Sequence, residues 1–98
     1  MVRGWFVGGF SPAVVNDNRF EVAVQMYDKG SKEDLHVHKV AYEITVIAKG
    51  RARMNNQEFE AGDIIHIHPG EHTDFEALED TITVVVKAPS VPDDKFLI

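Results

Sequence analysis

His36, His38 and Glu43 are the residues of this sequence whose types and spacing are best suited to binding a metal ion. Side chains alternate faces along a β-strand, so two histidines separated by one residue point the same way. Glu43 follows five residues after His38 and would arrive from the next strand, adding a carboxylate to the two imidazoles. Two histidines and one carboxylate leave other coordination positions open. The spacing therefore predicts a divalent metal site with room for water, substrate or oxygen.

Two glycines, Gly30 and Gly50, extend this group into a longer pattern. Between them the order is five residues, histidine, one residue, histidine, four residues, glutamate and six residues. This pattern resembles the first motif of the cupin superfamily, with every defined position filled, and the resemblance covers roughly residues 20–88. It implies an all-β fold, a small antiparallel jelly-roll (cupin) β-barrel, in which the two histidines and the glutamate face the interior.

The second motif of that family is matched less well. Laid without gaps from Gly62, it places Gly70 correctly but puts Thr73 where a further histidine ligand is expected, and His72 falls one position early. A shift of one residue moves a strand side chain to the opposite face. On this alignment the site has three protein ligands, and Thr73 offers at most a hydroxyl or a bound water. If the turn at Pro69-Gly70 is one residue shorter, His72 becomes the fourth ligand.

His66 and His68 form a second pair with the same spacing. They share a face with Ile64, opposite Ile65 and Ile67. If that face lines the barrel, His66 could approach the ion or hold a substrate anion. We favour the alternative, in which these histidines belong to the polar outer face of a half-exposed strand.

The resemblance implies a metal-binding cupin that acts on a small organic molecule. The ligand set suits ferrous iron and would also hold manganese, cobalt, nickel, copper or zinc, so the sequence does not identify the metal. The metal would polarise a carbonyl or hydroxyl group or activate oxygen, as in an oxygenase, isomerase or lyase, and Glu43 could serve as a base. Two alternatives stay open: a module that binds a small molecule or sugar without turning it over, and a metal that serves structure or assembly only.

Short strands joined by tight turns must position these residues. The clearest strand alternates at period two, with Phe20, Val22, Val24 and Met26 on one face and Glu21, Ala23, Gln25 and Tyr27 on the other. Asn55-Asn56 predicts a two-residue hairpin loop, because asparagine tolerates positive φ. We predict strands at residues 5–10, 20–28, 43–48, 51–54, 57–61, 64–68, from 73 onward and at 82–87, with the first histidine pair on a further one. No stretch sustains the helical period, which indicates an all-β sandwich or barrel.

The chain length of 98 residues fits a single cupin domain over residues 1–98. Within it we expect a barrel core at about 20–88, a short N-terminal strand at 5–10 and a C-terminal tail at 89–98. The tail ends in Phe96, Leu97 and Ile98, an apolar end that must either lie back across the barrel or pack on a second subunit. We favour the subunit contact and expect a homodimer, because single-barrel cupins are often dimers.

Composition limits the partners. The net charge of −6 disfavours nucleic acid and anionic membrane surfaces, which leaves a small-molecule ligand as the expected partner. The absence of cysteine excludes a disulfide framework, a thiolate metal site and a cysteine nucleophile. No signal-peptide pattern and no apolar run of about 20 residues occurs, so a soluble, cytoplasmic protein is expected.

Overall fold

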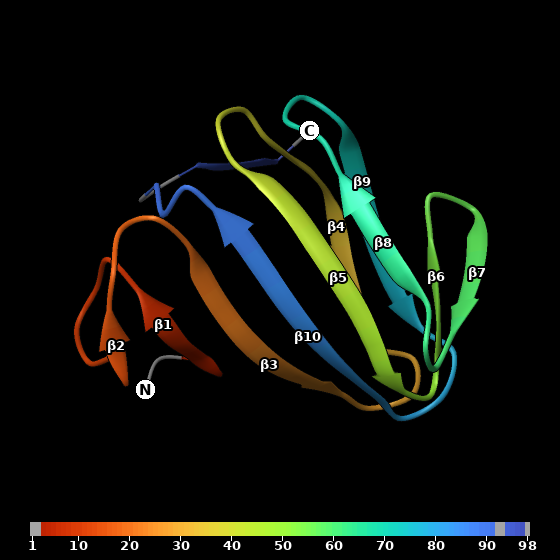
Figure 1. Cartoon of the computed structure of the whole chain (residues 1–98). Helices are drawn as coiled ribbons and strands as arrows, with labels where there is room; N and C mark the ends of the chain where they lie inside the picture. The colour runs from red at the N-terminus through yellow and green to blue at the C-terminus, as the bar shows by residue number, and fades with distance from the viewer. Residues whose placement is uncertain (1–2, 92–93, 98) are drawn as a thin grey trace.

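The computed structural model describes residues 3–91 and 94–97, which form eleven β-strands and no helix (Figure 1). The strands are β1 (Trp5–Gly8), β2 (Val15–Asn16), β3 (Glu21–Tyr27), β4 (Lys32–His38), β5 (Tyr42–Lys49), β6 (Arg51–Met54), β7 (Gln57–Glu60), β8 (Ile64–Ile67), β9 (His72–Ala77), β10 (Thr81–Ala88) and β11 (Lys95–Leu97). The all-β prediction is confirmed, and β2 and β11 are the two strands that the sequence pattern did not predict. With no helix in the described part of the chain, none is available to cross a membrane.

The strands form two sheets that face each other (Figure 1). The six-stranded sheet has the order β2-β1-β3-β10-β5-β8, and the five-stranded sheet has the order β11-β4-β9-β6-β7. Every pairing between described strands is antiparallel except the short one between β1 and β2. The jelly-roll prediction is confirmed, in the form of an open sandwich whose two sheets do not close into a barrel.

A small apolar core lies between β5 and β8 of one sheet and β6 and β9 of the other. Its buried members are Ile47, Ala52, Met54, Ile67, Phe75 and Ala77. The ring of Tyr27 packs against that of Phe75, with 4.4 Å between the ring centroids. This cluster holds the two sheets together beside the space that the polar side chains occupy.

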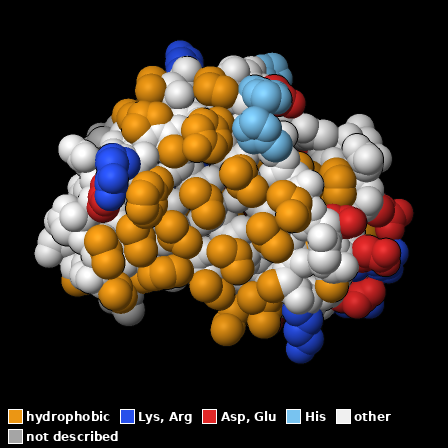
Figure 2. Space-filling model, in the orientation of Figure 1, with side chains coloured by type: hydrophobic (Ala, Val, Ile, Leu, Met, Phe, Trp, Pro, Cys, Tyr) orange, Lys and Arg blue, Asp and Glu red, His pale blue; other side chains and the backbone are white. Residues whose placement is uncertain are grey.

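The alternation predicted for residues 20–28 is confirmed in β3, and its polar set faces inward. Ala23 is fully buried, whereas Val24 and Met26 are 39% and 78% exposed. Because antiparallel neighbours in register share faces, β5 and β10 present the same arrangement. The outer surface of this sheet is consequently apolar, as the broad hydrophobic area in Figure 2 shows.

The C-terminal tail lies back on its own domain. β11 pairs antiparallel with β4 at the edge of the five-stranded sheet, with Lys95 opposite His38 and Leu97 opposite His36. This is the alternative that we did not favour from the sequence, and it gives the tail a partner strand without a second subunit. Ile98, the last residue of the predicted contact, lies outside the described residues.

The two-residue loop between β6 and β7 has the predicted conformation. Asn55 and Asn56 have φ values of 51° and 64°, and Met54 pairs directly with Gln57. Two successive positive φ values define the type I′ turn that matches the twist of the flanking strands. Asn55 is also held in place from outside the loop, because its backbone N–H donates to Asp74 Oδ1 at 2.8 Å.

We expect Asn56→Val to lower the free energy of unfolding by about 1–2 kcal/mol, because a β-branched residue is strained at positive φ. Asn56→Gly should leave the stability unchanged or raise it slightly, because glycine adopts this conformation without strain. Chemical denaturation of both variants measures the difference. Equal stabilities for the two variants would show that the conformation of the loop does not limit folding.

Candidate metal and ligand site

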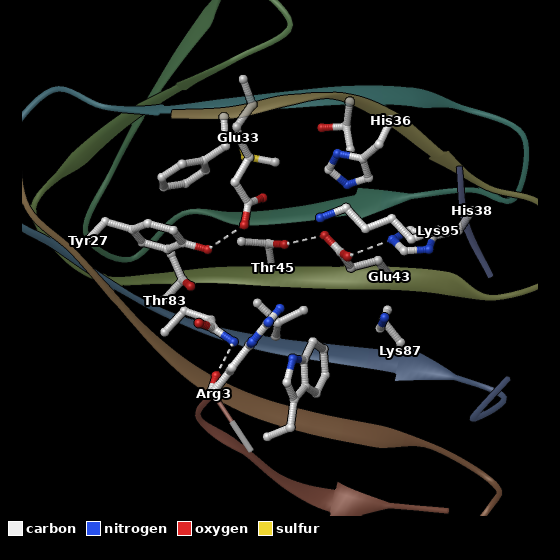
Figure 3. Close-up of a pocket in the computed structure, with 16 residues that line it drawn as sticks. Arg3, Tyr27, Glu33, His36, His38, Glu43, Thr45, Thr83, Lys87 and Lys95 are labelled. Atoms are coloured by element: carbon white, nitrogen blue, oxygen red, sulfur yellow. Dashed lines mark hydrogen bonds and ion pairs between the residues drawn. The ribbon is translucent and has the colours of Figure 1, made fainter. Parts of the chain in front are cut away.

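A cavity of about 280 Å³ lies between the two sheets, beside the apolar core (Figure 3). Its walls come from β1, β3, β5 and β10 of the six-stranded sheet and from β4, β6, β9 and β11 of the other. Most of the side chains that line it are polar: Arg3, Gln25, Tyr27, Glu33, His36, His38, Glu43, Thr45, Thr73, Thr83, Lys87 and Lys95. A volume of this size fits a small organic molecule.

His36 and His38 both line this cavity, as their spacing predicts, and each is 4% exposed. The Nδ1 of His36 donates to the backbone oxygen of Asp34 at 2.8 Å, and that of His38 donates to the backbone oxygen of Asp94 at 3.0 Å. A carbonyl oxygen only accepts, so each ring carries a proton on Nδ1, and Nε2 is the nitrogen left for other partners. Histidines that bind metals are held in this way, with the second nitrogen donating to a carbonyl or carboxylate.

Glu43 projects from β5 toward the same cavity (Figure 3). Burial raises the pKa of its carboxyl group, but hydrogen bonds accepted from His38 and from the Thr45 hydroxyl, together with the nearby positive charge of His38 and Lys87, outweigh burial and lower that pKa. Glu43 is therefore ionised. Its Oε1 lies 3.5 Å from His38 Nε2. At this distance His38 Nε2–H can donate to the carboxylate, or the two atoms can serve as ligands of one metal ion.

The donor set fits a divalent metal in its chemistry. Two Nε2 atoms and one ionised carboxylate are ligands that iron, manganese, zinc and related ions accept. His38 Nε2 and Glu43 Oε1 lie 3.5 Å apart. Two atoms bound to the same ion can be at most two bond lengths apart, about 4 Å, so this distance allows both to bind one metal ion. Within residues 3–91 and 94–97, however, no three His, Asp or Glu side chains are already gathered around one point. The rings of His36 and His38 lie 5.4 Å apart, centroid to centroid.

The structure places Thr73, and not His72, on the cavity wall. β9 begins at His72, and its register with β4 sets Thr73 opposite His36 and His72 opposite Val37. Thr73 is 2% exposed, whereas His72 is exposed on the other face. The alternative in which His72 is a fourth ligand is corrected accordingly. β9 has already begun at His72, and because side chains alternate along a strand, His72 points away from the cavity when Thr73 points into it.

His66 and His68 lie on the outer surface, as we favoured from the sequence. Both are exposed, and their ring centroids are 4.2 Å apart. His66 is paired with Ile44 on the outward side of β5, and its ring meets the edge of Tyr42 at 5.7 Å. These two histidines therefore do not reach the cavity.

Several cavity residues were not predicted from the sequence. Tyr27 donates to Glu33 Oε1 at 3.1 Å, and burial, followed by the charge of Glu33, raises the pKa of the tyrosine well above its usual value. Thr83 is 1% exposed, and its Oγ1 has no hydrogen-bond partner among the described residues. The signal that could have found Tyr27 was the polar face of the strand at 20–28, because that face is the one turned inward.

Two lysines also enter the cavity (Figure 3). Lys87 Nζ lies 3.4 Å from Glu21 Oε1 and 4.6 Å from the ring centroid of Trp5, so its charge is already compensated. Lys95 comes from β11 and shares the inward face of His38, the residue opposite it. No ion pair to Lys95 occurs among residues 3–91 and 94–97. Lys95 therefore leaves a positive charge available to a bound anion.

Asp94 fixes the position of this end of the site. It is 6% exposed, and its carboxylate accepts hydrogen bonds from the backbone N–H groups of Lys39, Val40 and Ala41, between 2.8 and 3.2 Å. Burial raises the pKa of Asp94, and these hydrogen bonds outweigh burial and lower it. Its backbone oxygen accepts from His38 Nδ1. One residue of the tail thus anchors the loop after β4 and orients a candidate ligand.

Comparison with known proteins identifies the fold. No protein-family model matches the sequence, and no curated protein matches it significantly. Among solved structures, an uncharacterized conserved protein with a double-stranded β-helix domain from Klebsiella pneumoniae is 26% identical, with a TM-score of 0.76 over 83% of this chain and 71% of that one. An RmlC-like cupin from Shewanella frigidimarina is 17% identical, with a TM-score of 0.73 over 79% and 72% of the two chains.

The DMSP lyase DddQ from Ruegeria pomeroyi is similar over a longer part of this chain. It is 16% identical, with a TM-score of 0.79, and the match covers 95% of this chain and 49% of the lyase. This chain thus spans about half the length of that enzyme. The chain therefore has the cupin fold, a double-stranded β-helix, and the resemblance predicted from the first motif is confirmed at the level of the fold.

We expect Asp94→Ala to lower the free energy of unfolding at pH 7 by about 2–3 kcal/mol, because three backbone donors lose a charged acceptor. The folded pKa of Asp94 lies below its ordinary value of 3.8, so its contribution is present above that pH and is lost as the pH falls through the folded pKa. The difference from the unmodified protein should therefore shrink in strong acid. Chemical denaturation at pH 7 and over a series of pH values down to pH 2 tests this.

Asp28→Ala is the matched control, because Asp28 is exposed and no hydrogen bond to its carboxylate occurs within the described residues. We expect little change at either pH. A loss of stability in Asp94→Ala that persists unchanged in strong acid would show that packing, and not the carboxylate, holds the loop.

Proposed function

We propose that this chain is a metal-binding cupin that acts on a small organic molecule held between its two sheets. His36, His38 and Glu43 would hold a divalent transition metal. The observation that carries the proposal is the orientation of the two histidines: both donate Nδ1–H to backbone carbonyls, and both line the cavity that Glu43 enters. The similarity in fold to a DMSP lyase supports an activity on a small molecule.

A bound divalent metal would polarise a carbonyl or hydroxyl group of the ligand or activate oxygen. The side chains of this protein would supply the rest. Glu43 is ionised and lies near enough to the histidines to accept a proton from a ligand held there. The hydroxyl of Thr73 would lie next to His36 on the five-stranded sheet, across the cavity from Glu43.

Lys95 points to the chemical class of the ligand. Its ammonium group faces the cavity without an ion pair among the described residues, so a ligand with a carboxylate or another anionic group would gain a charge-assisted hydrogen bond there. Thr83 supports a polar ligand as well, because an unpaired buried hydroxyl costs about 1–3 kcal/mol until a partner occupies it. We therefore propose a small organic acid as the ligand.

A second candidate function is the binding of an organic acid without metal and without turnover, as a sensor or accessory module. It is favoured by the same lysine, whose positive charge would repel a metal ion in the same cavity. It is also favoured by the separation of the two histidine rings, whose centroids lie 5.4 Å apart. Among the described residues, the two rings and Glu43 do not form a cluster close enough to bind one ion together. Metal content and product formation separate the two candidates.

We expect protein purified without a histidine tag to contain close to one equivalent of a divalent transition metal, measured by inductively coupled plasma mass spectrometry. His36→Ala and Glu43→Gln should each reduce it to below about a tenth, because removing a ligand from a three-ligand site weakens binding by orders of magnitude. The double variant His66→Ala, His68→Ala is the matched control and should keep its metal, because this pair has the same spacing on the outer face.

Metal that stays bound in His36→Ala, or that disappears only in the double variant, would contradict the assignment. Less than a tenth of an equivalent in the unmodified protein, after growth and refolding with each metal, would favour the metal-free binding module.

We expect organic acids to raise the melting temperature more than neutral sugars of similar size do. Lys95→Met should abolish most of this stabilisation, because it removes the charge that the anion meets. Lys32→Met, an exposed lysine on β4, should leave it intact. Thermal shift assays with metal-loaded protein, followed by product analysis, provide both readouts.

Product formation from a stabilising acid would establish an enzyme, and stabilisation without product would support the binding module. A preference for neutral ligands, or equal effects of the two lysine variants, would contradict the role of Lys95.

A further inference from the structure

The cavity has a second polar end, distant from the candidate metal ligands. Figure 3 shows Tyr27, Glu33 and Thr83 at that end of the space and His38 at the other. Gln25 also lines the cavity and is directly opposite Thr83 in the six-stranded sheet. We call Gln25, Tyr27, Glu33 and Thr83 the acceptor end.

The strand registers separate the acceptor end from the candidate metal ligands. Lys87 pairs with Glu43, and Thr83 lies four residues before Lys87 on the same face of β10. Four residues of a strand rise about 13 Å. Val85 and Thr45 form the pair between these two levels, and both line the cavity. A ligand bound beside Glu43 must therefore extend across Val85 to reach the acceptor end.

Thr83 differs from the other buried threonines. Four threonines are at most 3% exposed: Thr45, Thr73, Thr81 and Thr83. The hydroxyls of the first three donate hydrogen bonds, Thr45 to Glu43 and the other two to backbone oxygens. Thr83 Oγ1 has no partner in the described part of the chain. A buried hydroxyl without a partner is unfavourable, so a ligand that pairs with it gains affinity.

The other residues of the acceptor end offer mainly lone pairs. Tyr27 donates its proton to Glu33 Oε1 at 3.1 Å, and burial, followed by the charge of Glu33, raises the pKa of Tyr27, so the hydroxyl keeps this proton. No hydrogen bond reaches Glu33 Oε2 among residues 3–91 and 94–97. Gln25 Nε2 donates to the backbone oxygen of Arg3 at 2.9 Å, which leaves Gln25 Oε1 as an acceptor. A molecule that fits this end must therefore supply donors.

We infer that the acceptor end is a second subsite of the cavity, which binds a hydrogen-bond-donating group, a hydroxyl or an ammonium, at the far end of the ligand. This inference rests on the proposed binding of an organic acid. The acid would place its carboxylate at Lys95 and its donor at Thr83 and Glu33, with a hydrocarbon segment passing over Val85. An ammonium group would also compensate Glu33, which has no ion pair within the described residues.

The first test is the binding of acids with four to eight carbons to the full chain as purified. At each length, the unsubstituted acid is compared with the acid that carries a terminal hydroxyl and with the one that carries a terminal ammonium. Trp5 is the only tryptophan of the sequence and lines the cavity, so its fluorescence reports occupancy. We expect a substituted acid to bind roughly 10-fold more tightly than the unsubstituted acid of its length, because it satisfies acceptors that the other leaves unpaired.

Variants locate this gain in affinity. Thr83→Val should remove most of it and leave the binding of unsubstituted acids unchanged. Thr81→Val is the matched control, because Thr81 lies two residues earlier on the same face of β10 but is not among the residues that line the cavity. It should keep the gain. Glu33→Gln should weaken the ammonium-bearing acids more than the hydroxy acids, because it removes the charge but keeps an acceptor oxygen. The tighter-binding series identifies the donor as a hydroxyl or an ammonium.

The second test needs no ligand. Thr83→Val should raise the melting temperature by roughly 4 °C or more, because a methyl group replaces a buried hydroxyl without a partner. Thr81→Val should lower it, because the Thr81 hydroxyl donates to the backbone oxygens of Arg51 and Glu79. Thermal unfolding followed by circular dichroism measures both. A Thr83→Val variant less stable than the unmodified protein would show that this hydroxyl is already paired, and would overturn the inference.

Failure of the acceptor end and failure of the proposed function give different results. Unsubstituted acids that bind through Lys95, with no gain from a terminal donor, would overturn the acceptor end and leave an organic acid as the ligand. A gain that Thr83→Val keeps would also overturn it. Hexane-1,6-diol carries no carboxylate. If acids bind no better than this diol, and its binding is lost in Thr83→Val but kept in Lys95→Met, the acceptor end stands and the proposed organic acid is wrong. Binding of none of these probes would overturn both.

Discussion

The alternation of side chains along β3, β5 and β10 is the constraint on which both the cavity and the outer surface depend. A strand has only two faces, so each residue turned inward fixes its neighbours outward. Gln25, Thr45 and Thr83 face inward and supply polar groups to the cavity. The residues beside them, Val24 and Val84 among them, must then face outward. A polar interior and an apolar exterior are thus two consequences of one pattern.

The C-terminal tail completes the site from the opposite sheet. Asp94 holds the loop after β4 through its carboxylate and holds the ring of His38 through its backbone oxygen. The next residue, Lys95, brings a positive charge into the cavity. Asp94 and Lys95 lie 56 positions and more from His38 in sequence. Asp94 nevertheless fixes the proton on Nδ1 of this candidate metal ligand, and Lys95 adds positive charge to the cavity. The site is assembled only when β11 is docked against β4.

Local spacing was sufficient to predict the first part of the site. His36 and His38 face the same way because a strand has a period of two, and Glu43 faces them because it lies on the inward side of the next strand in sequence. The choice between Thr73 and His72 could not be made in this way. It depends on the residue at which β9 begins, and a boundary shifted by one position reverses the outcome.

Other features lay beyond local patterns. The alternation at residues 20–28 is equally visible whichever face is inward, and the usual assumption that apolar residues face the core would have selected the wrong face. Asp94 and Lys95 carried no local signal, because their roles depend on pairing with β4, far away in sequence. The tail was recognised as apolar, but its strand partner follows from tertiary structure, which a single sequence does not specify.

The cavity also limits how the domain is stabilised. Its polar lining occupies much of the space between the sheets, and the buried apolar cluster is confined to the neighbourhood of Ile47 and Phe75. Of the three largest fully buried side chains, Ile47 is apolar, whereas Thr81 and Thr83 are hydroxyl residues. A chain of this length buries only about two-thirds of its unfolded surface, so apolar area turned outward is stabilisation that the single chain does not obtain. Filling the cavity with apolar side chains would restore that burial, but it would remove the polar groups of the site. The six-stranded sheet therefore presents Glu43 and Thr45 to the cavity, while the tail and β4 position the histidines from the other side.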